Sequence, residues 1–597
     1  MSCRIDAVTA SSALASALDH SRFTRLETAK PEAMLPALPV FSRPQHDTKL
    51  PIKGYSSPIR VLFERVVRCG QRWPRALLFI SALIYVSALI TWASNNSDKH
   101  DATPVKILPS GEVVPRRLRC VAWRATAKCR PNGPREPQND KKCSDFVVGD
   151  VSGFCEVEDI DTGERFQVMR RHCNSLKGNI KFRCSDARTF VNYRVDGHGA
   201  VAKALVPGFS LPHVAENSEA PRDGIVMVVY PKLLASAYAT VRVLREVVMC
   251  RLPIEIWFHV DEIGADYALL VPLQQLAIFV GNVSFHPMYN PRAKGFLSKV
   301  FAIYNTYFDR VLFLDADNVP VRDPSFLFST PEFKANGAVF WPDFWHPHRT
   351  LFNLHAQSML WELLDTPFID MFEQESGQLL VDRTRHAAPL ELVYFYAFHE
   401  PNFFEKLDVV YGDKDLFRLA WMKLKVPFHM VEALPAMAGR AINGSFCGMT
   451  MAQHDTKGEV LFLHRNQHKL TGERDEKMEK AASENTVVPP DEALGAPHPD
   501  GYPDPVIWTH LLSFRKDANR KLYTIDAYRA SPEFPQWQPC YGRRYEEQQK
   551  VFELHEFANL SFAGIETDIR HFALDAARLR HAQNVAWVGA SPSNSTA

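Results

Sequence analysis

The chain has 597 residues, which is more than one hydrophobic core usually supports, so one large or two moderate folded units with tails are expected. Its 69 Lys and Arg residues nearly balance 68 Asp and Glu residues, which argues against nucleic acid or another polyanion as the general partner of the surface. Hydrophobic residues make up 46% of the chain, and this globular composition excludes disorder along most of its length.

The N-terminal region predicts a tail followed by a membrane anchor. Residues 1–75 are rich in Ser, Pro and Ala without a sustained apolar period, which is typical of a disordered tail. Residues 76–93, ALLFISALIYVSALITWA, carry no charge and have about the length that spans a bilayer. Four arginines precede this run, so the positive-inside rule places residues 1–75 in the cytoplasm and the remainder in a lumen. The alternative, a cleaved signal peptide, would begin nearer the N-terminus.

Cysteines cluster after a short stem at residues 94–117. Six of the chain's 11 cysteines fall between residues 118 and 200, a segment in which Gly, Asp and Asn turns separate short apolar patches. Zinc sites usually contain a close C-x-x-C pair, and none occurs here, so a small disulfide-stapled module is favoured over a metal site. The sequence does not define which cysteines pair: Cys120, Cys129, Cys143, Cys155, Cys173 and Cys184.

Sequons add to the prediction that the C-terminal portion is lumenal. Asn282, Asn443 and Asn559 each begin an Asn-x-Ser pattern, and all three follow the apolar run.

From residue 224 onward, strand and helix patterns alternate. Such alternation is typical of a parallel α/β sheet. The apolar runs of strand length are residues 225–230, 254–260, 277–280 and 310–314, and helical faces are formed by Ala237, Val241, Leu244 and Val248 and by Phe296, Val300 and Tyr304. We expect a catalytic domain over residues 201–597, with a core at 224–469, a charged, Pro-rich surface loop at 471–505 and a C-terminal part at 506–597.

Two carboxylates, Asp315 and Asp317, directly follow the strand at 310–314. Ligands of open α/β sheets bind at the carboxyl ends of strands, so position and chemistry coincide here. Mg²⁺ and Mn²⁺ prefer oxygen ligands together with substrate phosphates, and an Asp-x-Asp pair can hold such an ion with a diphosphate. The pair therefore predicts a site for a metal-bound nucleotide sugar.

The segment around this pair resembles the donor site of the fungal-type Golgi α-mannosyltransferases. The resemblance extends from about residue 224 to 469 and rests on several ordered segments: ASAYATVRVLREVVMCRLPIEIWFHVDEI, KGFLSKVFAIYNTYFDRV, VLFLDADNVPVRDPSFLF, GAVFWPDFW, QESGQLLVDR, GDKDLFRLAW and VLFLHRNQHKL. The tail, the cysteine-rich segment and the loop after Lys469 lie outside it.

The resemblance implies a glycosyltransferase of the GT-A type, with a Rossmann-like mixed sheet flanked by helices. It implies transfer of mannose from GDP-mannose, with retention of configuration, to a glycan or glycoprotein acceptor in the Golgi. His464 stands where GT-A enzymes commonly supply a third metal ligand, which gives Asp315, Asp317 and His464 as the predicted Mn²⁺ or Mg²⁺ set.

The three predicted ligands have different expected roles. Asp317 is expected to bind the metal directly, and Asp315 to meet the ribose or a metal-bound water. His464 ends an apolar strand at 460–463, as Asp315 ends its own, so both can reach one site; the alternative is a histidine satisfied within the core.

Other polar residues in the matched segments are predicted site residues. Glu375 and Gln378 offer groups to the sugar hydroxyls or the anomeric face, although QESGQ reads equally as a polar turn. Asp413 and Asp415 could bind the sugar or acceptor, but a helix cap at Asp413 is the alternative. The residues predicted to hold the donor are Asp315, Lys299, Trp341, Asp343, Ser376, Gly377 and Lys469, with Trp341 stacking on a sugar and Gly377 permitting close approach of a ligand.

Three other functions fit parts of the sequence. A UDP-sugar transferase would use the same motif. A haloacid-dehalogenase-type phosphatase also carries D-x-D, but on the first strand of its domain, whereas strands precede Asp315 here. A membrane-tethered glycan-binding protein could retain the fold without turnover.

Overall fold

The computed structural model describes residues 104–590 apart from 110–111, 216–219, 265–266, 490–491, 531, 536–537 and 544–549, and for 584–590 it describes the backbone alone. The chain divides into two units, Met1–His100 and Asp101–Ala597, and all described residues belong to the second. The predicted tail and membrane helix, residues 1–75 and 76–93, therefore lie outside the described residues. Within the described residues, no helix has both the length and the apolar character required to cross a membrane.

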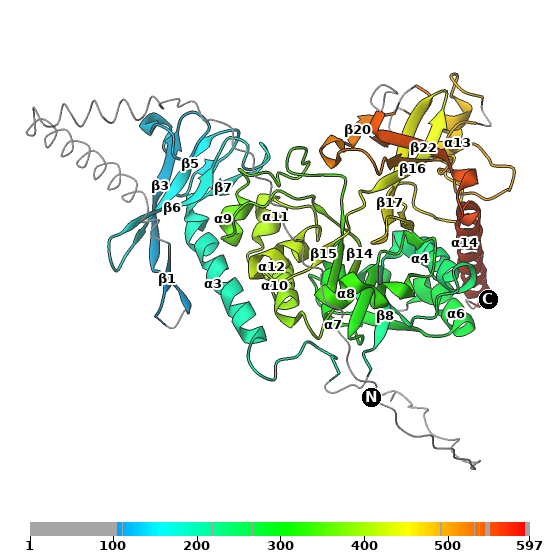
Figure 1. Ribbon diagram of the computed structural model, residues 1–597, viewed down its shortest axis with the longest axis horizontal. Coiled ribbons are helices and arrows are strands. Elements are labelled where there is room, and N and C mark those ends of the chain that lie inside the picture. The colour runs from blue at the N-terminus through cyan, green and yellow to red at the C-terminus, as the bar shows by residue number, and fades with distance from the viewer. Residues whose placement is uncertain are drawn as a thin grey trace, which may run out of the picture. The chain divides into compact units, whose positions relative to one another are not determined.

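A seven-stranded mixed sheet organises the second unit (Figure 1). Four neighbouring strands are parallel, β14 runs antiparallel to β11 and β13, and β15 is parallel to β13. The mixed α/β architecture was predicted, and so were the strands that became β8, β9 and β11. In spatial order the strands are β10 (Val283–Met288), β9 (Ile254–His259), β8 (Asp223–Val229), β11 (Arg310–Leu314), β14 (Gln374–Asp382), β13 (Ala338–Pro342) and β15 (His429–Met430).

The apolar run at 277–280 is not a strand, and that prediction was wrong. It is the end of helix α6 (Val271–Val280), which starts with Pro272 in its first turn and stops at Gly281. The helix buries Leu273 and Leu276, while Ile278 and Phe279 are more than 80% exposed. A short apolar run cannot by itself distinguish the two structures, and here the following residues form β10.

The central strands are apolar throughout because both faces of the sheet are covered. In β8, Ile225, Met227 and Val229 enter one core and Val226 and Val228 the other. The first face packs on α4 (Leu234–Arg242), α6 and α14 (Ile565–Ala590), and the second on α7 (Leu297–Asn305), α10 (Ala387–Phe398) and α12 (Leu416–Leu424). Shorter helices are α5 (Val260–Ile263), α8 (Pro331–Asn336), α9 (Leu360–Leu364) and α11 (Phe403–Leu407).

A second, eight-stranded sheet adjoins the first and was not predicted. Within this sheet a disulfide joins Cys447 to Cys540, and these cysteines lie 93 residues apart in the sequence. The path β12-β18-β17-β16-β19-β22 carries β21 and β20 at its side. The strands are β12 (Asn318–Pro320), β16 (Ala436–Ile442), β17 (Ser445–His454), β18 (Val460–His464), β19 (His510–Phe514), β20 (Asp526–Arg529), β21 (Pro539–Gly542) and β22 (Phe552–Glu556).

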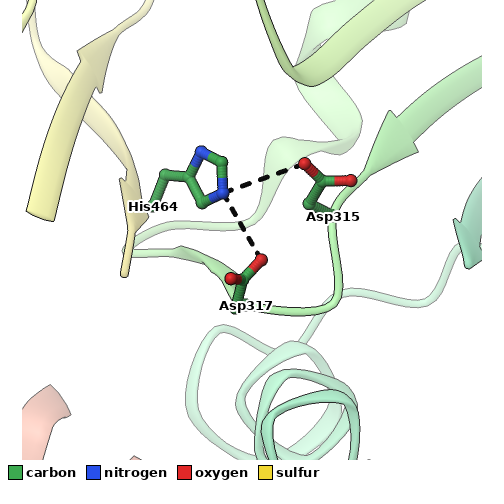
Figure 2. Close-up of side chains that lie close together, drawn as sticks. All are labelled: Asp315, Asp317 and His464. Atoms are coloured by element: carbon green, nitrogen blue, oxygen red, sulfur yellow. Dashed lines mark ion pairs between the residues drawn. The ribbon is translucent and has the colours of Figure 1, made fainter. Parts of the chain in front are cut away.

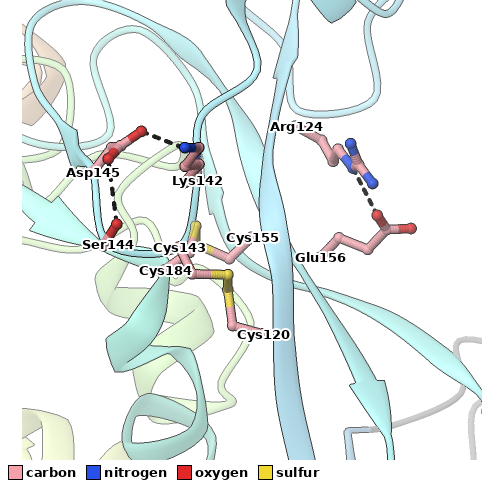
Figure 3. Close-up of a disulfide and its surroundings, with 9 residues drawn as sticks. All are labelled: Cys120, Arg124, Lys142, Cys143, Ser144, Asp145, Cys155, Glu156 and Cys184. Atoms are coloured by element: carbon pink, nitrogen blue, oxygen red, sulfur yellow. Dashed lines mark hydrogen bonds and ion pairs between the residues drawn. A yellow bond between two sulfur atoms is a disulfide. The ribbon is translucent and has the colours of Figure 1, made fainter.

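The cysteine-rich segment forms the disulfides that its composition predicted. The pairs are Cys120–Cys143, Cys129–Cys173 and Cys155–Cys184, and Figure 3 shows the first and third lying together beside the strands. The predicted stem contains the paired strands β1 (Val105–Ile107) and β2 (Val113–Pro115). The cysteine-rich segment and the residues that follow it contain β3 (Leu118–Thr126), β4 (Phe146–Val147), β5 (Ser152–Asp159), β6 (Arg165–Arg171), β7 (Phe182–Arg183) and helix α3 (Ala187–Ala204).

This segment shares its core with the main sheet. Trp123 and Phe190 belong to the same buried cluster as Phe313 of β11 and Trp421 of α12. Helix α3 packs on α10, and the carboxylate of Glu362 in α9 accepts hydrogen bonds from two backbone N–H groups of β6. The cysteine-rich residues are thus an integral layer of the second unit.

The segment 471–505 is not the open surface loop that was expected. It contains helix α13 (Glu476–Ser483), capped by the Asp475 side chain. Met478, Ala482, Val488 and Leu494 are buried in the same core as β8. The many charged and proline residues favoured a surface loop. The apolar residues that enter the core are too few to predict a helix.

A buried carboxylate fixes the start of β11. Asp309 is 1% exposed and accepts hydrogen bonds from the Arg222 guanidinium and from the backbone N–H groups of Ala215 and Arg222. Although burial opposes ionisation, these donors lower the pKa of Asp309 to about 2. The contact ties β11 to the residue that precedes β8.

Replacing this carboxylate should destabilise the unit in a pH-dependent way. Because its pKa is lower in the folded than in the unfolded chain, Asp309 contributes stability above about pH 4 that disappears as the pH falls toward 2. Asp309→Asn should therefore cost about 2 kcal/mol at pH 7, measured by urea unfolding, and progressively less below pH 4. Asp261→Asn, at an exposed ion pair, should change little; an equal loss in both variants would contradict this assignment.

Candidate active site

The Asp-x-Asp pair lies where the chain passes from one sheet to the other. Strand β11 ends at Leu314, and strand β12 of the second sheet begins at Asn318. Between them the chain turns, with the Asn318 N–H donating to the Asp315 carbonyl at 2.9 Å. The two carboxylates therefore occupy the junction of the sheets.

Neighbouring strands hold this turn on both sides. On one side, the Asp315 N–H donates to the Gly377 carbonyl of β14 at 2.9 Å. On the other, Asn318 is the register partner of His464 in antiparallel β18. The Asn318 amide also donates to Gln378 at 2.6 Å, so it joins β12 to β14. Asn318 was not predicted to be a site residue, because a single buried amide side chain produces no recognisable pattern in the sequence.

The predicted metal ligands converge. The Nε2 atom of His464 lies 3.4 Å from Oδ1 of Asp317 and 3.8 Å from Oδ2 of Asp315 (Figure 2). One ligand atom from each residue lies within 4.8 Å of the others. Asp317 and His464 are buried and Asp315 is partly exposed, so the cluster opens to solvent on the Asp315 side. The sequence placed these residues together although 147 positions separate Asp317 from His464.

Glu375 orients the imidazole of His464. Its Oε1 lies 3.0 Å from Nδ1 of His464, which leaves Nε2 directed at the aspartates. Burial disfavours both charges, but their mutual hydrogen bond and attraction raise the pKa of His464 and lower that of Glu375 to about 2. An ionised carboxylate behind a histidine is the usual partner of a metal-binding imidazole. Glu375 was expected to meet a sugar; in this structure it supports His464.

Gly377 makes room for this histidine. A Cβ atom at residue 377 would lie 2.5 Å from Nδ1 of His464 and 2.8 Å from Oε1 of Glu375. Close approach was predicted here, but the group that approaches is an imidazole of the protein rather than a ligand.

Each aspartate of the pair contacts a lysine. The ammonium of Lys299 lies 3.2 Å from both Asp315 and Asp413 and donates to the Ser376 carbonyl at 2.7 Å. Burial opposes its charge, yet the surrounding carboxylates raise its pKa. Lys469 pairs with Asp317 and is about one-third exposed, and burial lowers its pKa to about 8. Both lysines that were predicted to hold the donor therefore lie beside the two aspartates.

The GDKD segment forms a second charged cluster. Lys414 is buried and pairs with Asp343 at 3.0 Å and with Glu373. Burial raises the pKa of Asp343 to about 7 and that of Asp413 to about 6, against the effect of the lysines. Lys414 and Glu373 were not predicted, although Lys414 stood between two candidate aspartates.

The expected helix cap at Asp413 was wrong. Helix α12 begins at Leu416, and Asp415 occupies the cap position. The Asp415 carboxylate accepts from the Gln374 N–H and from Arg418, so it fixes β14 to α12 instead of facing a ligand.

Two further candidates lie in the core. The Trp341 indole is fully buried, and its Nε1 donates to the His454 carbonyl at 2.8 Å, so it offers no face for sugar stacking. Gln378 is also 0% exposed, although its Nε2 has no hydrogen-bond partner among the described residues. Both residues lie on strands, and the sequence of a strand does not show whether a given side chain points into the core or toward a ligand.

The buried carboxylate of Asp317, the partly exposed carboxylate of Asp315 and the imidazole of His464, with Glu375 behind it, fit Mn²⁺ or Mg²⁺. Oxygen ligands suit both ions, and the imidazole favours Mn²⁺. The arrangement can hold a divalent cation together with a diphosphate, with cationic Lys469 at its margin.

Gly377→Ala should weaken metal binding because the new methyl group would displace His464 or Glu375. We expect about 10- to 100-fold weaker Mn²⁺ binding by calorimetric titration, the range found when the support of a ligand is disturbed.

Gly199→Ala is the matched control, since nothing lies within 4 Å of its Cβ position in α3. Mn²⁺ binding by Gly377→Ala at the wild-type level would show that the ring can shift without loss.

Comparison with known proteins finds similarity over the region that contains Asp315, Asp317 and Glu375, and the matched family model ends before His464. Residues 222–455 match a family model described as "Mannosyltransferase putative". Alpha-1,2-mannosyltransferase MNN21 of Candida albicans is 26% identical over 330 residues, covering 47% of this chain and 50% of that protein. Alpha-1,2-mannosyltransferase MNN5 of Saccharomyces cerevisiae is 25% identical over 339 residues, covering 48% and 56%. The chain thus spans about half the length of these relatives.

Among solved structures, the mannosyltransferase Ktr4p of S. cerevisiae in complex with GDP is 11% identical. It superposes with a TM-score of 0.25, covering 43% of this chain and 82% of that one. The galactosyltransferase LgtC in complex with donor and acceptor sugar analogs is 15% identical, with a TM-score of 0.23 and coverage of 34% and 70%.

Proposed function

We propose that the chain is a member of the fungal-type α-mannosyltransferase family and a metal-dependent glycosyltransferase of the GT-A type, a proposal supported by the family match over residues 222–455 and by the similar α-1,2-mannosyltransferases. It transfers mannose from GDP-mannose, with retention of configuration, to a glycan or glycoprotein acceptor and forms an α-linkage. The observation that carries the proposal is the convergence of Asp315, Asp317 and His464 at a strand end.

The three side chains would hold Mn²⁺ or Mg²⁺, which as a Lewis acid would stabilise the charge of the departing diphosphate. Asp317 and His464 would be the direct ligands, and Glu375 would keep Nε2 of His464 directed at the metal. Partly exposed Asp315 would meet the nucleotide. Lys469 is the cation best placed for a phosphate because its side chain remains one-third exposed. Lys299 is fixed between Asp315 and Asp413, and it positions Asp315.

The sugar end of the donor would lie against β14. Ser376 and Gly377 bring this strand close to Asp315, and Gln378 lies one residue farther along it. Asp413, held by Lys299, and Asp343, held by Lys414, carry carboxyl groups whose pKa burial raises toward neutrality. In their protonated form these groups can donate hydrogen bonds to sugar hydroxyls.

The proposed location is the lumen of the Golgi, with residues 76–93 as a single-pass anchor of type II. Four disulfides support an oxidising compartment. The sequon asparagines Asn282, Asn443 and Asn559 are all exposed, as glycosylation would require.

The phosphatase alternative is less well supported. Its nucleophilic aspartate would follow the first strand of the sheet, whereas Asp315 follows β11, after β8, β9 and β10 in chain order. His464 and Glu375, which approach from two other strands, also have no place in that mechanism.

Asp317→Asn should lower the turnover of GDP-mannose by at least about 100-fold, because it removes a charged metal ligand while keeping the side-chain volume. Turnover is measured with Mn²⁺ on residues 94–597, before and after chelation. Chelation should abolish wild-type activity and added Mn²⁺ should restore it.

Asp517→Asn, at an exposed ion pair, is the matched control and should retain full activity. Metal-independent turnover, or full activity of Asp317→Asn, would refute the proposed site. Binding of glycans without any turnover would instead favour a glycan-binding protein.

A panel of nucleotide sugars tests the donor. We expect Mn²⁺-dependent binding of GDP-mannose and GDP, measured by calorimetry, at least about tenfold tighter than that of UDP-glucose or UDP-galactose. A preference for a UDP-sugar would overturn the donor assignment and leave the metal site intact.

A further inference from the structure

A pocket of about 450 Å³ opens beside the proposed donor site, at the start of α7. Its volume falls in the range of small-molecule sites. One wall is the segment that leads into α7, with Arg292, Lys294 and Phe296, and the other is formed by residues before α12, with Glu405 and Gly412. Nothing in the proposed donor chemistry uses this pocket.

Two aromatic rings stand half-exposed at its edge. Phe296 is 53% exposed and Tyr411 is 52% exposed, and their ring centroids lie 5.2 Å apart. Tyr411 also contacts Phe352 at 5.1 Å, which holds it in place from the other side. Gly412 allows this packing, because its φ is +59° and a Cβ there would meet the Phe296 ring at 2.6 Å. Aromatic rings held together in water beside a pocket indicate a surface that a ligand covers.

A short chain of contacts connects the wall of the pocket to the metal-ligand cluster. Gly412 lines the pocket and precedes Asp413, which pairs with Lys299 at 3.2 Å, and Lys299 pairs with Asp315 at the same distance. A ligand on the two rings would therefore lie next to the donor site.

The charges around the pocket favour a neutral, polar ligand. Arg292 is paired with Glu400 at 2.7 Å and Lys294 with Asp261 at 2.7 Å, so neither cation is available in full to a phosphate. The exposed Glu405 carboxylate makes no ion pair or side-chain hydrogen bond within the described part of the chain and can accept from a hydroxyl group. A sugar combines apolar C–H faces, which pack on aromatic rings, with hydroxyl groups for such partners.

We propose that Phe296, Tyr411 and the adjoining pocket form the subsite for the terminal sugar of the acceptor glycan. The proposal rests on the proposed function, because it places the acceptor beside the metal-bound donor. The rings bind a sugar face, and Glu405 contributes specificity through a hydroxyl group. Phe296 and Tyr411 are thus binding residues that select the acceptor and take no part in the departure of the diphosphate.

The test compares Tyr411→Ala, Phe296→Ala and Tyr411→Phe with the wild-type protein. A mannose-terminated oligosaccharide is titrated by calorimetry in the presence of GDP and Mn²⁺, and its KM is measured where transfer occurs. Both alanine variants should bind the oligosaccharide about tenfold more weakly, the worth of one aromatic contact, while the Kd for GDP with Mn²⁺ moves less than about twofold. Tyr411→Phe retains the ring and should bind like the wild type.

Tyr289→Ala is the matched control, since Tyr289 is 69% exposed and does not line the pocket. Thermal unfolding of each variant verifies its fold. Unchanged oligosaccharide binding in both alanine variants would overturn the proposal. A loss of GDP binding as large as the loss of oligosaccharide binding would also overturn it, because the rings would then belong to the donor site or serve only the fold. Failure of the proposed function would differ, because the wild-type protein would then bind no nucleotide sugar with Mn²⁺.

Discussion

The site depends on one short connection, the turn from β11 into β12, being held by backbone hydrogen bonds to two different strands. The Asp315 N–H is bonded to β14, and Asn318 is in register with His464 of β18. Because strand pairing fixes which residues face each other, the register that aligns Asn318 with His464 also brings the imidazole to the aspartates. A slip by one residue in either pairing would turn a ligand to the opposite face.

Around this turn, each charged side chain lies close to one of opposite charge. Asp315 contacts Lys299, Asp317 contacts Lys469, and His464 contacts Glu375. Buried charges are tolerated when each has a partner, and removal of one leaves another uncompensated. The network therefore positions the side chains before any ligand binds, which is the preorganisation that charge-stabilising sites require.

Local patterns in the sequence predicted much of this molecule. Strands buried on both faces read as apolar runs, so β8, β9 and β11 were found, and the cysteine cluster indicated its disulfides. Ordered motifs brought Asp315, Asp317 and His464 together correctly. The predictions that were wrong concerned features set by tertiary packing. Neighbouring residues in the sequence do not show that the Trp341 side chain points into the core or that residues 277–280 end helix α6. Of the second sheet only the strand at 460–463 was predicted, because the sheet pairs segments that lie far apart in the sequence, such as β16 with β19.

The shared core of the cysteine-rich layer has a consequence for how an active molecule matures. Phe313, two residues before Asp315, lies in the same buried cluster as Cys155 and Cys184, which are joined to each other. The disulfide and strand β11 therefore stabilise the same core. A polypeptide kept under reducing conditions would lack this covalent link in the core that supports β11, the strand that carries Asp315 and Asp317 at its end.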